Sequence, residues 1–324
     1  MSLDELRGRI DEIDIKLQEL FEERMKLCDE VAVEKIRISA PVLQTNREEL
    51  IIENVRNRAE SGFEDSSESF IKSVMDISKN RQKKKVSCEI LAEAAVKSVC
   101  AVIACGGNSS RMGGVNKLTA ELCGEAVIIR TIKAFEKVEA IGKIILSVSK
   151  NSADEIEKLV NKAGLSKPVE IVYGGSTRQE SVANGVVKAN DFGYVCIHDG
   201  ARPLITADVI ERAINDAYSF GASVVCTPSK DTIKLSDGER VLKTPPREML
   251  FSAQTPQVIR RDLYLKAYEK AKASGLDFTD DSQLCEFYGV NPKITVGEYT
   301  NIKITTSEDM VIAGEILNNM RVTK

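Results

Sequence analysis

The sequence predicts a two-domain protein in which an all-α helical module precedes an α/β domain with a mostly parallel sheet. Only Gly8 and Gly62, out of 20 glycines, precede residue 99, so the first part favours long helices and the second favours many short elements joined by turns. Apolar residues in the first part recur at helical spacing, whereas short apolar runs beyond residue 99 alternate with helical patterns. We expect domains over 1–85 and 99–324, joined by a linker over 86–98.

The composition argues against several classes of protein. Of the 324 residues, 43% are hydrophobic and 29% are charged, as in globular domains, and the net charge of −4 gives no reason to expect a nucleic-acid partner. No apolar run approaches the roughly 20 residues of a membrane span. The charged start MSLDELRGRIDE is unlike a secretory signal, so we expect a cytoplasmic protein. The eight cysteines form no CxxC pair and His198 is the only histidine, which argues against a zinc site.

The first helical pattern, over about residues 3–38, carries a cation where an apolar residue is expected. Position 24 of the pattern is Arg24, and a charge on a packed face is costly unless an anion meets it. Lys35 lies close to three turns further on, on the Arg24 face, whereas Arg7 lies on another face. A helix about 54 Å long is unstable alone, so we expect it to pack along a partner chain. Its apolar residues follow the 4–3 spacing typical of packed helices: Leu6, Ile10, Ile13, Leu17, Leu20, Leu27 and Val31.

Two further helices are expected after Pro41. Thr45-Asn46-Arg47-Glu48 is a capping box that begins one of them. The other spans about 67–82, where Ser78 and Gln82 lie one turn apart beside the apolar stripe. Two interpretations remain open at this point: a helical dimerisation or regulatory module with solvated charges, or a site for an anion that meets Arg24.

The first part resembles the all-helical, type II class of chorismate mutases over residues 3–82. The resemblance implies an intertwined homodimer that rearranges chorismate to prephenate. That reaction is unimolecular, so a site must hold a compact conformer and place donors at the oxygen where charge grows. The resemblance rests on an ordered series of motifs: Leu6-Arg7, Ile10-Asp11, Ile13-Asp14, Glu23-Arg24, Lys35, Pro41-Val42, Arg47-Glu48, and Ser78 with Gln82.

Residue roles in this part follow from the resemblance. Arg24 and Arg47, together with Arg7 of the other chain, would clamp the two carboxylates of chorismate. Lys35 and Gln82 would donate to its ether oxygen.

Three polar positions complete the implied mutase site. Glu48 would meet the ring hydroxyl, although a purely capping role for it stays open, and Ser78 would line the site. The family often has an acidic residue where this chain has Gln44, a difference that would weaken hydroxyl binding without removing the clamps.

The second part predicts a mostly parallel, Rossmann-like sheet covered by helices on both faces, because continuous apolar strands alternate with crossover helices. Ligands bind such sheets at the carboxyl ends of the strands. The expected strands are 99–105, 143–149, 169–173, 193–197, 222–227, 293–296 and 302–305, and the expected helices lie near 126–139, 151–163, 178–190, 206–219 and 260–274.

Polar motifs fall at those carboxyl ends. ACGGNSSRMGGVNK (104–117) follows the first strand, GGSTRQES (174–181) the third and HDGARP (198–203) the fourth. The first loop is neither a Walker A motif nor GxGxxG, so a P-loop kinase and a dinucleotide-dependent dehydrogenase are poor fits. Glycines at 106 and 107 let backbone N–H groups approach a phosphate, and Arg111 and Lys117 add cations. The loop therefore predicts a polyphosphate site.

Over about residues 99–322 the chain resembles the cytidylyltransferases of the methylerythritol phosphate route to isoprenoids. The resemblance rests on these three motifs, on AQTPQ (253–257), TDD (279–281) and NIKIT (301–305), and on their order. It implies a homodimeric α/β nucleotidyltransferase that joins CTP to 2-C-methyl-D-erythritol 4-phosphate and releases diphosphate, using Mg²⁺. The nearest alternative keeps this chemistry with another sugar or polyol phosphate as the acceptor.

By the same resemblance, the opening loop and the loop after the third strand hold CTP. Arg111 and Lys117 would stabilise the charge that accumulates at the α-phosphorus. Cradling and nucleotide contacts would come from Ala104, Gly106, Gly107, Gly175, Ser176 and Ser181.

The remaining assignments concern the acceptor. Asp199 would lie by the ribose, Mg²⁺ and acceptor, and Arg202 and Lys303 would hold the acceptor phosphate. Lys230 stands where the family usually has an arginine that reaches the other subunit's acceptor; lysine keeps the charge but loses the bidentate fork. His198 is expected to be structural, and the roles of Thr255 and Asp280 stay open.

Overall fold

The computed structural model describes residues 1–37, 45–92, 96–106 and 116–322; Gln44, Gly107 and Arg111 therefore lie outside the described residues. The chain divides into two compact units, a helical one within residues 1–93 and an α/β one that takes in nearly all the rest. Within the described residues, no helix combines the length and the apolar character needed to cross a bilayer.

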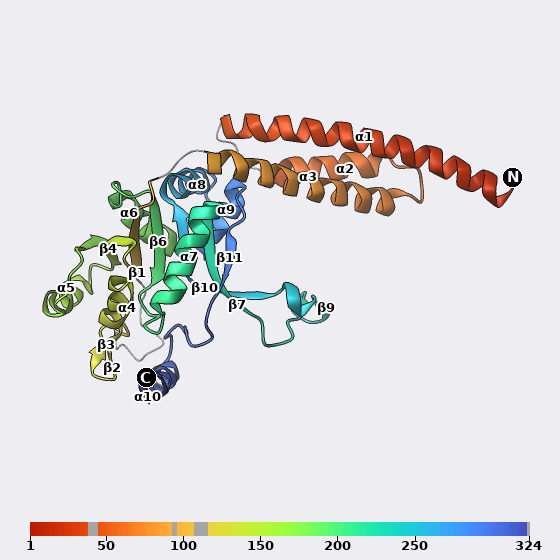
Figure 1. Ribbon diagram of the computed structural model, residues 1–324. Helices are drawn as coiled ribbons and strands as arrows, with labels where there is room; N and C mark the ends of the chain where they lie inside the picture. Colours follow the sequence, from red (N-terminus) through yellow and green to blue (C-terminus); the bar gives the residue numbers. More distant parts are fainter. Residues whose placement is uncertain (38–44, 93–95, 107–115, 323–324) are drawn as a thin grey trace. The chain divides into compact units, whose positions relative to one another are not determined.

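The helical unit consists of α1 (Leu3–Arg37), α2 (Thr45–Arg58) and α3 (Glu64–Ala92), with α3 packed against both others (Figure 1). Its small core joins Met25 and Cys28 of α1 to Val74 of α3. The third helix begins earlier and ends later than the expected 67–82, and its last turns occupy residues assigned above to the linker. Apolar side chains of α1 outside this core are exposed in the single chain, among them Leu6, Ile10, Ile13, Leu17 and Leu20.

The α/β unit is built on a sheet of seven strands within the described residues, in the order β11-β7-β10-β6-β1-β4-β5. All neighbouring strands are parallel except β10, which runs antiparallel to both β6 and β7. The strands are β1 (Val99–Cys105), β4 (Ile141–Val148), β5 (Val169–Tyr173), β6 (Tyr194–Asp199), β7 (Ala222–Pro228), β10 (Phe251–Arg260) and β11 (Lys293–Val296).

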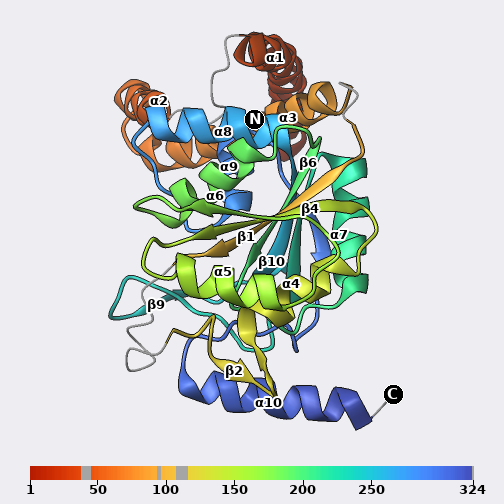
Figure 2. The ribbon, with the colours of Figure 1, turned by 90° about the vertical axis from the view of Figure 1, so that its left-hand side faces the viewer.

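Helices cover both faces of this sheet (Figure 2). On one face α4 (Val127–Glu136), α5 (Ala153–Lys162) and α7 (Ala207–Phe220) bury alternate residues of β1, such as Ala101 and Ile103, in the main core. On the other face α6 (Arg178–Lys188) packs on β1 and β4, and α8 (Arg261–Ala273) packs on α6 and β10. A Cβ at Gly185 of α6 would lie 2.6 Å from Val102 Cγ1, so a glycine lets this helix approach the sheet.

Smaller elements complete the unit. They are the hairpins β2–β3 (Glu121–Leu122, Glu125–Ala126) and β8–β9 (Leu235–Ser236, Val241–Lys243), the 3₁₀ turn η2 (Arg247–Met249), and the helices α9 (Asp281–Tyr288) and α10 (Ser307–Val322).

Two strand predictions need correction. Residues 302–305 form no strand: Ile304 donates its N–H to the Ala201 carbonyl oxygen at 2.8 Å, and its side chain packs on Leu122 and Leu204. Apolar and polar residues alternate over 302–305 because this loop packs Ile304 into a core on one side, while Lys303 and Thr305 line a cavity on the other. Conversely, β10 was not predicted as a strand, because Pro256 and the buried polar residues around it are untypical of a central strand.

Candidate active sites

A cavity of about 640 Å³ lies at the carboxyl ends of β1, β4, β5 and β6 in the α/β unit. Because these strands are parallel neighbours, the loops that follow them meet at one edge of the sheet. The lining includes most of the predicted site residues of this unit: Ala104, Gly106, Lys117, Gly175, Ser176, Ser181, Asp199 and Lys303. Arg202 lies next to Asp199, so the structure brings the nucleotide and acceptor candidates together.

The loop after β5 is pressed against the first turn of α6. Gly175 donates its N–H to Ser181 Oγ at 3.0 Å, and Ser181 Oγ donates to the Thr177 carbonyl oxygen at 2.7 Å. A Cβ at Gly174 would lie 2.7 Å from Ser181 Oγ, so only glycine allows this approach. Thr177 caps the helix by accepting the Glu180 N–H at 3.1 Å. The loop therefore presents backbone groups to the cavity in a fixed arrangement.

Asp199, at the end of β6, faces three cations. Lys303 Nζ lies 3.0 Å and Arg202 Nε 3.3 Å from its Oδ2, whereas Arg178 Nε lies 3.6 Å from its Oδ1. Burial alone would raise the pKa of Asp199, but the charges of Lys303, Arg178 and Arg202 outweigh burial and hold it well below the usual range. The carboxylate is therefore ionised and available as a hard oxygen ligand.

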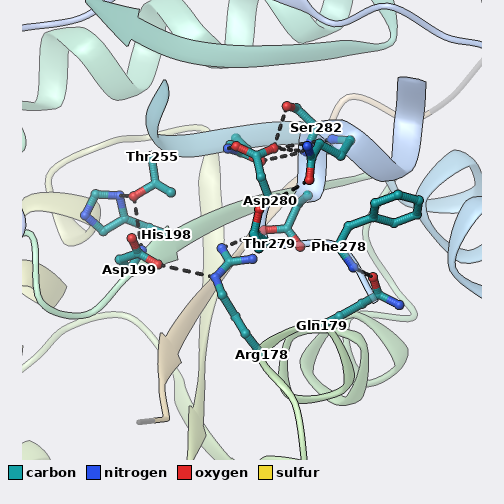
Figure 3. A network of polar contacts seen from close by, with 12 residues as sticks. Arg178, Gln179, His198, Asp199, Thr255, Phe278, Thr279, Asp280 and Ser282 are labelled. Carbon is teal, nitrogen blue, oxygen red and sulfur yellow. Dashed lines mark hydrogen bonds and ion pairs between the residues drawn. The ribbon is translucent and has the colours of Figure 1, made fainter. Parts of the chain in front are cut away.

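His198 and Thr255 support the backbone at Asp199 through hydrogen bonds (Figure 3). Thr255 Oγ1 accepts the Asp199 N–H at 3.1 Å and lies 2.9 Å from His198 Nδ1, and His198 Nε2 lies 3.1 Å from the Arg202 carbonyl oxygen. Burial lowers the pKa of His198 to about 4, so the ring is neutral at pH 7. A neutral ring that donates from Nε2 accepts the threonine hydroxyl at Nδ1. Both residues thus support the site from outside the cavity.

Sequence reasoning passed over Arg178 and Asp281. Arg178 lines the cavity as the first residue of α6, and its Nη2 lies 2.7 Å from Oδ2 of Asp281, whose side chain is 1% exposed. Arg178 stands inside the motif GGSTRQES, so its position in a polar loop after an apolar strand was the available signal. The partner Asp281 is 103 residues further along the chain, and no local pattern connects the two.

Lys230 lies outside the cavity of its own chain. It follows β7, and its Nζ lies 3.7 Å from the centre of the Tyr299 ring. Beyond it the chain forms an exposed arm over 229–250 that includes β8 and β9, with apolar side chains such as Leu235 and Leu242 in solvent. The arm also carries Arg247, which donates to Thr232 Oγ1 at 2.9 Å and was not singled out from the sequence.

The helical unit contains a second cavity, of about 150 Å³. Its lining brings together Arg24, Lys35, Arg47, Glu48, Ser78 and Gln82, all predicted, with Cys28, Val31, Ile51, Met75 and Lys79. Arg7 is exposed, pairs with Asp4 at 3.7 Å and does not line this cavity. The prediction placed Arg7 in the site of the other chain, which these contacts do not test.

Polar contacts arrange the cations of this second cavity. Arg24 Nη1 donates to Ser78 Oγ, which in turn donates to the Val74 carbonyl oxygen at 2.6 Å. Lys35 Nζ donates to Gln82 Oε1 at 3.1 Å, and burial, with a smaller effect from the Arg47 charge, lowers the pKa of Lys35.

The charge balance of the second cavity favours an anion. Lys79, which the sequence analysis did not assign, pairs with Glu48 at 3.1 Å. The described lining thus has one carboxylate, that of Glu48, against four cations: Arg24, Lys35, Arg47 and Lys79.

Comparisons with known proteins match each of the two units to a family. The family model described as 2-C-methyl-D-erythritol 4-phosphate cytidylyltransferase matches residues 99–319, and the model described as chorismate mutase type II matches residues 6–83.

Relatives of the α/β unit are full-length matches. The 2-C-methyl-D-erythritol 4-phosphate cytidylyltransferase of Caldanaerobacter subterraneus subsp. tengcongensis is 44% identical over 220 residues, which is 67% of this chain and 97% of that protein. The protein of the same name from Alkaliphilus oremlandii is 42% identical over 224 residues, 68% of this chain and 95% of that protein. The crystal structure of 4-diphosphocytidyl-2C-methyl-D-erythritol synthase from Anaerococcus prevotii is 35% identical with a TM-score of 0.63, covering 68% of this chain and 96% of that one. The chain therefore belongs to the 2-C-methyl-D-erythritol 4-phosphate cytidylyltransferase family and carries a type II chorismate mutase domain ahead of its nucleotidyltransferase domain.

Proposed function

We propose that the α/β unit transfers the cytidylyl group of CTP to 2-C-methyl-D-erythritol 4-phosphate. The observation that carries this proposal is the cavity whose lining brings a backbone-rich loop together with Asp199 and Lys303, with Arg202 paired to Asp199 beside it. The backbone of Gly175 and the Ser181 hydroxyl suit the recognition of a base edge, whereas Arg202 and Lys303 suit an acceptor phosphate.

Positioning and electrostatic stabilisation supply the catalysis in this proposal. The acceptor phosphate attacks the α-phosphorus and diphosphate leaves, so negative charge grows between two anions. Lys117, in the cavity lining, would meet that charge, and Arg111 would join it from the same loop.

Asp199 is the residue that would hold Mg²⁺. Its carboxylate is ionised, and Mg²⁺ is commonly bound by one or two carboxylates together with substrate phosphates. The described residues contain no cluster of three or more acidic, histidine or cysteine ligands, so a fit with Mg²⁺ depends on Asp199 and the triphosphate. The ion would neutralise phosphate charge when bound.

The transferase proposal is tested with full-length protein, CTP and a panel of acceptors that includes a pentitol and a pentulose phosphate. Diphosphate release is expected with 2-C-methyl-D-erythritol 4-phosphate, and a higher kcat/KM with another acceptor would overturn the assignment. Lys117→Ala should lower kcat, because the activation free energy rises by about 2–4 kcal/mol, while the affinity for CTP changes little. Lys150→Ala, an exposed lysine outside the cavity lining, is the control.

We propose further that the helical unit rearranges chorismate to prephenate. Arg24 and Arg47 would clamp its carboxylates, and Lys35 and Gln82 would donate to the ether oxygen. Arg7 of a partner chain in a homodimer would complete the clamp. Disappearance of chorismate in the presence of full-length protein tests this proposal. No rearrangement above the uncatalysed rate would leave a dimerising or regulatory module as the function of this unit.

A further inference from the structure

Three cations surround the Asp199 carboxylate, and they divide between its two oxygens. Lys303 Nζ and Arg202 Nε both lie near Oδ2, at 3.0 and 3.3 Å, whereas Arg178 Nε approaches Oδ1 at 3.6 Å. On the proposed function, the first two cations also hold the acceptor phosphate. An arriving phosphate dianion competes with Oδ2 for them, so of the three cations only Arg178, at Oδ1, keeps its contact with Asp199 in the loaded site.

Arg178 is held independently of the cavity. Its Nη2 lies 2.7 Å from Oδ2 of Asp281, and the Asp281 side chain is 1% exposed, so this pair is screened less than a pair on the surface. The Arg178 Nη1 atom is buried without a hydrogen-bond partner among the described residues. The Arg178 guanidinium is therefore anchored by Asp281 on one side. On the other side it is directed toward the Asp199 carboxylate.

The anchor itself is fixed by contacts from three elements. Asp281 begins α9, and the preceding Asp280 caps that helix by accepting the Ser282 N–H at 2.7 Å. Gln257 of β10 donates to Asp280 Oδ2 at 2.9 Å, tying α9 to the sheet. Gln179 of α6 accepts the Phe278 N–H at 2.8 Å, which ties the start of α6 to the segment before α9 (Figure 3). These contacts join the start of α6, β10 and the start of α9 around the Arg178–Asp281 pair.

We propose that Arg178 is a positioning residue for Asp199, and that the buried Asp281 is the counter-charge that holds Arg178 for this task. Arg178 keeps the Asp199 carboxylate in place when the acceptor draws Arg202 and Lys303 away from it. This inference rests on the proposed transferase function. The position of Asp199 should depend on Arg178 most when both substrates are bound. It should depend on Arg178 little when CTP binds alone, because Arg202 and Lys303 then still hold Asp199.

The test compares Arg178→Gln with wild type in the full-length protein, by calorimetric titration with CTP and by steady-state kinetics with both substrates. The dissociation constant for CTP should stay within about threefold, whereas kcat should fall about 10- to 100-fold, the scale expected when a mostly buried carboxylate loses one of its ion-pair partners. Arg178→Lys should recover part of kcat, since it keeps the charge but not the fork. Arg212→Gln is the control, with neither quantity changed, because it removes an exposed ion pair with Asp208 on α7 and a hydrogen bond to the Val296 carbonyl oxygen, both away from the cavity lining.

Asp281→Asn separates an anchor from a general structural role. If Asp281 acts through Arg178, this change lowers kcat in the wild-type background and lowers it no further in the Arg178→Gln background. Equal losses in both backgrounds would overturn the anchor, and a kcat of Arg178→Gln within threefold of wild type would overturn the positioning role. A loss of CTP affinity as large as the loss of kcat would also overturn it. Wild-type protein that does not transfer to the acceptor would instead refute the proposed function itself.

Discussion

Thr255→Val removes one buried hydroxyl that serves two partners at the transferase site. Thr255 Oγ1 accepts the Asp199 N–H at 3.1 Å and lies 2.9 Å from His198 Nδ1, and all three residues are buried. Valine has nearly the same shape, so no cavity forms, but both partners lose their hydrogen bond where water cannot replace it. Each such loss costs about 1–3 kcal/mol, so the free energy of unfolding of the α/β unit should fall by about 2–6 kcal/mol.

Urea denaturation of the full-length protein, followed by circular dichroism, measures this change. Pulse proteolysis identifies which transition belongs to the α/β unit. Thr279→Val is the control, because Thr279 is exposed and its hydroxyl meets only Gln283 Oε1 at 3.3 Å. The control should stay within about 0.5 kcal/mol of wild type. A change that small for Thr255→Val as well would refute the reasoning, since it would mean that the hydroxyl is not the support of the Asp199 backbone.

Three further predictions concern the mutase site and the assembly of the chain. Arg24→Ala should abolish chorismate turnover and leave cytidylyl transfer nearly intact, because alanine favours the helix and removes a charge from it; loss of both activities would indicate a folding defect instead. Burial lowers the pKa of Lys35, so mutase kcat/KM should decline at an alkaline pH that is lower than the pH at which an exposed lysine titrates. Lys35→Arg should shift this decline to higher pH. An unchanged pH profile would exclude Lys35 as the donor. Mixing inactive Lys117→Ala and Lys230→Ala chains should restore up to roughly a quarter of wild-type transferase activity if Lys230 serves the partner's site. No recovery after verified subunit exchange would mean that Lys230 serves its own chain or no site.

The sequence by itself determined the two-part organisation, and its resemblance to two families pointed to about half of the residues that line each cavity. A strand buried on both faces needs a continuous apolar run, and a covering helix needs a 3.6-residue period, so the order of elements can be read locally. The ends of parallel strands must lie at one edge, which is why motifs as far apart as 104–117 and 198–203 could be assigned to one site. Arg24 was identified from the helical period, as a charge on an apolar helical face.

Only the tertiary structure decided which groups support those residues. The pairs Arg178 with Asp281 and His198 with Thr255 join segments that are remote in the chain, and a buried polar contact leaves no periodic pattern in sequence. The same limit explains β10, whose polar residues are satisfied by neighbouring strands and helices rather than by local structure. It also explains Lys303, which lies in a segment expected to be a strand, although Ile304 is buried in a core and Lys303 turns toward Asp199. Burial and pairing are properties of the folded chain, so they appear only when distant segments are brought together.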